Sequence, residues 1–224
     1  MSYLQIALSQ QLAPAEVPAA VRAALGKPLR RAAPLTQLAL IGALACLPAE
    51  RRGLPTALLW QSTRGPRQET RLLLEEISEG TAEPMPYDFL ATQPAIAAAQ
   101  IQPFIPGLRS ASYFPLDTPG TADWSLLLTL ATNWLAEGRY AQVLCTHLDH
   151  SQTTAEGQWL CLTQAALENP PARLQIGAMA TPGALPDTPD FPAHLAHWLA
   201  GKLDSPLQLR SATTSQLAVE FARL

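Results

Sequence analysis

The sequence predicts an α/β protein in which helices cover a mixed β-sheet. Up to about residue 138, apolar runs typical of buried strands alternate with segments whose apolar residues recur at helical spacing. Beyond that point several strand-like runs follow one another, and their short connections contain Gly, Pro or Asn, which favours antiparallel or edge pairing. Strands that alternate with helices and are then followed by further strands are typical of a layered α/β fold.

The predicted strands are short apolar or alternating segments. Residues 56–60 form an apolar run between Pro55 and a polar turn at residues 61–65, which suits a fully buried parallel strand. The remaining predicted strands are residues 3–8, 108–116, 141–149, 158–165 and 174–180.

The predicted helices lie between these strands, and several begin at a proline, whose fixed φ suits a first helical turn. Residues 35–47 are apolar nearly all round, which predicts a buried helix. The helix that begins at Pro66 and ends at Gly80 is predicted to bury an apolar stripe formed by Leu72, Leu73, Leu74 and Ile77. A loop is predicted at residues 81–87. Further helices are predicted at residues 14–25, 92–102, 122–137, 191–203 and 214–224.

Composition and charge exclude several classes of protein. The chain has 224 residues, 48% of them hydrophobic, which is enough for one domain over residues 1–224. A net charge of -3 supplies no basic field for nucleic acid. The start has no signal-peptide pattern and no apolar stretch is long enough to span a bilayer, so we expect a cytoplasmic protein without membrane insertion. Three cysteines without CxxC spacing predict reduced, buried thiols and no structural zinc.

Common catalytic signatures are absent from the sequence. There is no GxGxxG after the first strand, no GxxxxGKS/T and no GxSxG, so nucleotide-dependent enzymes and α/β-hydrolases are not favoured. We predict no cofactor and no metal.

The densest polar cluster lies at the end of the predicted strand 141–149. Cys145, His147 and Asp149 share one face of that strand, and His150 follows. His147, Asp149 and His150 are weak catalytic candidates, since a strand end that packs an imidazole against a partner is the more ordinary interpretation. Arg64, beside Gly65, has two interpretations: contact with an anion or a carrier-protein surface, or solvated loop charge, which is favoured.

Four segments in order resemble the β-ketoacyl synthase family of the thiolase superfamily: residues 58–65, 84–94, 110–131, and the pair 139–149 with 155–162. The resemblance is clearest to about residue 180, which leaves residues 181–224 as a C-terminal extension. It is closest to ketosynthase-like N-terminal domain proteins associated with chain length factors and aryl-polyene pathways. It implies a thiolase-like half with a mixed five-stranded sheet layered with helices.

The sequence departs from this family at the nucleophile. The family's nucleophile is a cysteine at the start of a buried helix, where backbone N–H groups stabilise a thiolate and an oxyanion. The corresponding position here lies near Thr121, and no cysteine is close to it. The family's catalytic histidines belong to a C-terminal half that this chain is expected to lack.

The resemblance therefore implies a non-catalytic accessory subunit in fatty-acid or polyketide biosynthesis of the aryl-polyene type. Its expected partners are a ketosynthase subunit, an acyl carrier protein or both, and a homodimer is an alternative. An apolar face that a second chain covers is expected, with the contact near residues 141–146. Two alternatives stay open: a divergent acyl-transferring enzyme that uses His147, Asp149 and His150, and a scaffold protein that kept the fold.

Overall fold

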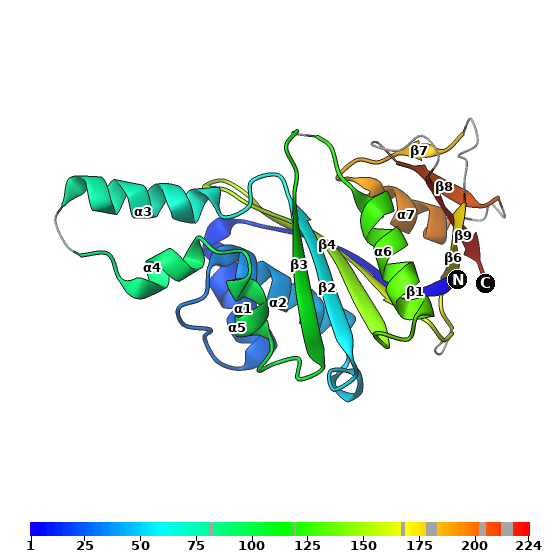
Figure 1. Cartoon of the computed structure of the whole chain (residues 1–224), viewed down its shortest axis with the longest axis horizontal. Coiled ribbons are helices and arrows are strands. Elements are labelled where there is room, and N and C mark those ends of the chain that lie inside the picture. Colours follow the sequence, from blue (N-terminus) through cyan, green and yellow to red (C-terminus); the bar gives the residue numbers. More distant parts are fainter. Residues whose placement is uncertain (81–82, 119, 167–168, 178–182, 202–204, 212–216) are drawn as a thin grey trace.

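The computed structural model describes residues 1–80, 83–118, 120–166, 169–177, 183–201, 205–211 and 217–224 (Figure 1). Within these residues the strands form one nine-stranded sheet in the order β3-β2-β4-β5-β1-β6-β9-β8-β7. The α/β class is confirmed, whereas the expected number of five strands is wrong. Within the segment expected to be an extension, residues 181–224, the strands β7, β8 and β9 continue the same sheet. Residues 181–182, 202–204 and 212–216 of that segment lie outside the described residues.

The sheet is mixed. β2 runs parallel to both β3 and β4, and most other pairs are antiparallel. The strands are β1 (Ser2–Leu12), β2 (Thr56–Ser62), β3 (Leu108–Pro115), β4 (Gln142–His150), β5 (Ala155–Thr163), β6 (Ala172–Gly177), β7 (Leu185–Pro186), β8 (Leu207–Arg210) and β9 (Ala218–Arg223). The six predicted strands correspond to β1 to β6 and are confirmed, with shifted ends, for their described residues. Residues 178–180 of the last predicted strand lie outside the described residues.

The predicted helix at residues 214–224 is wrong for its described part. Residues 218–223 form β9, which pairs with β6 on one side and β8 on the other. Val219 and Phe221 are two residues apart and both point into the core, which is the spacing of a strand rather than of a helix. Pairing with two neighbouring strands overrides the weak local preference for a helix. Residues 212–216 lie outside the described residues.

The helices cover both faces of the sheet. They are α1 (Val17–Leu25), α2 (Pro34–Cys46), α3 (Arg67–Glu79), α4 (Pro86–Ala91), α5 (Ile96–Ile101), α6 (Trp124–Ala136) and α7 (Phe191–Ala200). All were predicted except α4, which begins in the segment expected to be a loop. Residues 81–82 of that expected loop lie outside the described residues. Of the helix predicted at residues 191–203, residues 202–203 lie outside the described residues.

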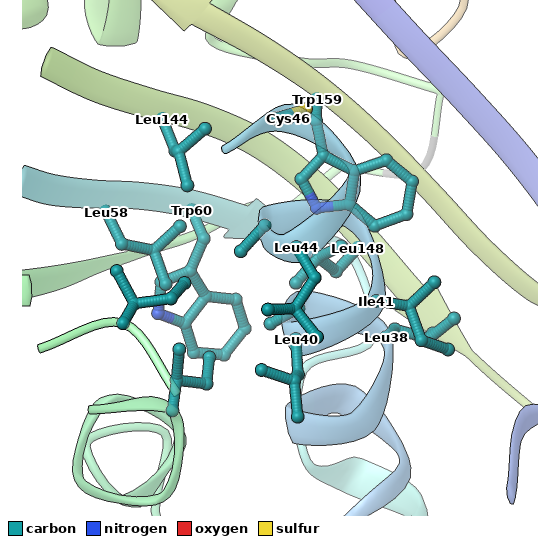
Figure 2. Close-up of a cluster of buried hydrophobic side chains, with 14 of the residues drawn as sticks. Leu38, Leu40, Ile41, Leu44, Cys46, Leu58, Trp60, Leu144, Leu148 and Trp159 are labelled. Carbon is teal, nitrogen blue, oxygen red and sulfur yellow. The ribbon is translucent and has the colours of Figure 1, made fainter. Parts of the chain in front are cut away.

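One hydrophobic cluster lies on each face of the sheet. On one face α2 packs against Trp60, Leu144 and Trp159 (Figure 2), and the predicted burial of α2 is confirmed. Gly42 makes this packing possible, because a Cβ there would lie 1.9 Å from the Trp159 ring. On the other face α6 and α7 cover the sheet around Trp124 and Phe221.

The expected buried stripe of α3 is wrong. Leu72, Leu74 and Ile77 are 50%, 59% and 47% exposed, and Leu73 is the buried leucine of this helix. α3 and α4 project from the body of the molecule (Figure 1), and no further layer formed by the described residues covers α3. Spacing predicts which face of a helix is apolar, but it does not show whether the same chain covers that face.

α4 also exposes large apolar side chains. They are Tyr87, Phe89 and Leu90, and Met85, the residue before α4, is exposed as well. We call the described part of residues 67–91 the α3–α4 arm. In the described part of the chain, no helix is both long and apolar enough to cross a membrane.

Candidate functional site

The sequence resemblance implies that the nucleophile position lies at the start of a buried helix, and α6 is the helix that follows Thr121. β3 ends at Pro115, a short turn follows, and α6 begins at Trp124 on the same side of the sheet as Cys145. The first N–H groups of a helix have no partner within the helix, so they are available to an anion.

In this chain those N–H groups are already bound. The N–H groups of Trp124 and Ser125 donate to the two carboxylate oxygens of Asp187, at 2.9 and 2.8 Å. The N–H of Asp123 donates to Oε1 of Gln61 at 2.7 Å. Two side chains from distant parts of the sequence therefore accept hydrogen bonds from the N–H groups at the start of α6, and we call this helix start closed.

Asp187 follows β7 and is only 4% exposed. Burial raises the pKa of its carboxyl to about 6, although hydrogen bonds from Ser125 and Trp124 favour the ionised form. A carboxylate at a helix N-terminus also interacts favourably with the helix dipole. The anion position at the start of α6 is thus occupied by a group of the chain itself.

Thr121 lies two residues before Asp123, the residue that precedes the first turn of α6. Its hydroxyl donates to the carbonyl oxygen of Thr118 at 2.6 Å. A nucleophilic hydroxyl needs a base that accepts its proton, and a carbonyl oxygen cannot act as that base. In the structure the Thr121 hydroxyl stabilises a turn through this hydrogen bond.

All three cysteines are free and buried, as predicted. Burial raises the pKa of each thiol, that of Cys161 to about 11. The Cys145 thiol donates to the carbonyl oxygen of Leu127, within α6 and not at its start. None of the three thiols can supply a thiolate at the nucleophile position.

His147 and Asp149 do come together at the end of β4. Nε2 of His147 lies 3.4 Å from Oδ2 of Asp149. Oδ1 of Asp149 accepts hydrogen bonds from the Ser62 hydroxyl at 2.7 Å and from the N–H groups of Thr63 and Arg64 at 3.0 Å each. Burial opposes ionisation of Asp149, but the hydrogen bonds from His147, Ser62 and Arg64 outweigh it and lower its pKa to about 2.

The His147 ring connects this network to the start of α6. Its centroid lies 6.4 Å from that of the Trp124 ring, and its Nδ1 is buried without a hydrogen-bond partner among the described residues. His150 is on the opposite face of β4, because successive side chains of a strand point to opposite faces. The three weak candidates are therefore not one cluster.

The sequence reasoning missed Gln61, Ser62 and Asp187. Gln61 and Ser62 were assigned to a polar turn, yet they are the last, fully buried residues of β2. Asp187 lies three residues before the exposed Asp190, and no local pattern distinguishes the two. Only the tertiary structure shows which of them reaches α6.

Asp149→Asn is expected to lower the free energy of unfolding at pH 7 by about 2 kcal/mol. The pKa of Asp149 is lower in the folded chain than its ordinary value of 3.8. Its contribution to stability is therefore complete above that value and is lost as the pH falls toward 2. Urea unfolding at several pH values should show a weaker acid dependence in the variant, with the exposed Asp190→Asn as the matched control. An unchanged acid dependence would contradict this role.

Comparison with known proteins supports the fold assignment. No protein-family model matches the sequence, and no curated protein matches it. Among solved structures, the chain is similar to a chain of the ketosynthase ApeO in complex with its chain length factor ApeC from Xenorhabdus doucetiae. The identity is 14%, 99% of each chain is covered, and the TM-score is 0.58. The ishigamide ketosynthase/chain length factor matches with 14% identity, 99% coverage of both chains and a TM-score of 0.66.

These matches define the class of fold: the chain has the thiolase-like fold of ketosynthases, which confirms the class of fold that the sequence resemblance implied. The expected half is not borne out by these two structures, because 99% of each matched chain is covered. Within that class, both solved structures contain a ketosynthase together with a chain length factor.

Proposed function

We propose that the chain is a ketosynthase-like accessory subunit in fatty-acid or polyketide biosynthesis of the aryl-polyene type, and that it forms no acyl-enzyme itself. The observation that carries this proposal is the start of α6, where the buried carboxylate of Asp187 binds the N–H groups of Trp124 and Ser125. A ketosynthase needs a thiolate and free oxyanion donors at that position.

The hydrogen bonds at the start of α6 support the proposal that this chain does not condense acyl groups by itself. A thioester carbonyl that develops negative charge would have to displace Asp187 from both N–H groups. Until it did, the carboxylate would repel that charge at close range. No cysteine is present at this position to begin the reaction.

Two features of the surface support the proposal that the chain binds a partner protein. Among the described strands, β3 ends the sheet with β2 as its neighbour, so its outer edge is available for pairing. The α3–α4 arm carries seven of the eleven large apolar side chains that are exposed in the described chain. The segment expected to carry the contact, residues 141–146, is an interior strand paired with β2 and β5, so it offers no free edge. We assign the ketosynthase contact to β3 and the α3–α4 arm.

Affinity capture of the tagged chain from its native host, followed by mass spectrometry, tests this function. We expect a complete ketosynthase, an acyl carrier protein or both among the captured proteins. A chain recovered alone, or only as a homodimer, would contradict the proposal. Capture of unrelated proteins without any acyl carrier would support the scaffold alternative.

A divergent acyl-transferring enzyme is the second candidate, and the buried contact between His147 and Asp149 is the observation in its favour. However, Ser62 and His147 both bind Asp149. In a catalytic triad the base contacts the nucleophile and the carboxylate orients the base. Loss of an acyl-transfer activity in a folded His147→Ala variant would favour this candidate.

A further inference from the structure

A second polar site lies on the other side of β4. The first turns of α3 and the hairpin between β4 and β5 line an open surface pocket of about 430 Å³, which we call the cavity. Figure 1 shows this hairpin beside the start of α3. Its lining includes Arg64, Arg67, Arg71, His150 and Ser151.

The charged side chains that line the cavity are all positive. Three arginines line the cavity and no carboxylate does. Arg71 pairs with the exposed Glu75 on the surface of α3, whereas the side chains of Arg64 and Arg67 form no ion pair with any described residue. The carboxylate of Asp149 faces the Arg64 backbone, and both of its oxygens already have partners. Oδ1 accepts a hydrogen bond from the Arg64 N–H, and Oδ2 contacts His147. Like charges that converge on one cavity repel one another, and a bound anion would relieve that repulsion.

His150 adds an independent observation. It is only 6% exposed, it lines the cavity, and its Nδ1 has no hydrogen-bond partner among the described residues. A buried polar atom without a partner costs stability unless something binds it. The start of α3 contributes the positive end of a helix dipole to the same place.

We propose that this cavity binds the phosphate group of a small phosphate monoester. Guanidinium groups match phosphate oxygens in pairs, and arginine clusters together with a helix start are how proteins commonly hold such dianions. The volume of the pocket suits a small molecule. This site is separate from the start of α6, so it does not depend on the proposed accessory role.

Titration calorimetry with inorganic phosphate and with glycerol 3-phosphate, at constant ionic strength set by sodium chloride, tests the site. We expect saturable binding of both, with Arg64→Gln and Arg67→Gln each weakening it about tenfold. The matched control is Arg139→Gln, an exposed arginine next to the opposite end of β4, which should leave binding unchanged.

Three outcomes would overturn the proposal. They are the absence of saturable heat with either probe, equal weakening in the Arg139→Gln control, and binding of an acidic protein by a chain that ignores both phosphates. Because Arg64 and Arg67 are exposed, their variants should keep the wild-type unfolding midpoint. If one of them fails to fold, Arg71→Gln provides the same test.

Discussion

Replacing Asp187 by alanine is expected to lower the free energy of unfolding by about 3 kcal/mol, because two buried N–H groups at the start of α6 would lose their acceptor. Each unsatisfied buried donor costs about 1 to 3 kcal/mol. Asp187→Asn should cost less, since its carbonyl oxygen can still accept one of the two hydrogen bonds. Urea unfolding at pH 7 measures both effects.

Asp190→Ala is the matched control for Asp187. Asp190 lies in the same loop, and its carboxylate is exposed and accepts a hydrogen bond from the exposed Thr188 hydroxyl. Its loss should cost no more than about 0.5 kcal/mol. Equal stability of the two alanine variants would mean that Asp187 does not hold the start of α6.

The double variant Leu74→Asp, Phe89→Asp is expected to reduce capture of the proposed ketosynthase partner about a hundredfold. Both side chains are exposed on the α3–α4 arm, so the charges should leave the fold intact. In a desolvated interface each charge would be buried without a partner, at a cost of more than a factor of ten in affinity. Quantitative capture of the ketosynthase, with the unfolding midpoint as a check of the fold, measures the effect.

Leu54→Asp is the control for the arm. Leu54 is a comparably exposed leucine that lies outside the arm, in the segment before β2. Its substitution should leave capture unchanged. Capture that survives the arm variant, or that is lost equally in Leu54→Asp, would move the contact away from α3 and α4.

Local sequence patterns predicted many of the helices and strands of this fold. The all-apolar helix α2 and the buried strand β2 were predictable because burial on every side leaves a continuous apolar run. The alternation of β4 also predicted that His147 and Asp149 share a face, and the structure joins them. These features depend on residues close together in the sequence.

Features that depend on distant neighbours were not predictable in this way. β9 is a strand because β6 and β8 flank it, and β6 lies about 40 residues earlier in the sequence. Leu72 and Leu74 were expected in the core because the sequence does not show which chain covers an apolar helix face. Asp187 reaches α6 from about 60 residues away, and no spacing rule connects such a residue to a helix start.

Reconstitution of condensation tests the accessory role most directly. The purified chain, the ketosynthase captured with it, and the two together would each be incubated with acyl and malonyl carrier proteins, and the condensed product would be measured by mass spectrometry. We predict no product from the chain alone and more product from the pair than from the ketosynthase alone. Condensation by the chain alone would contradict the inference that Asp187 closes a site without a nucleophile.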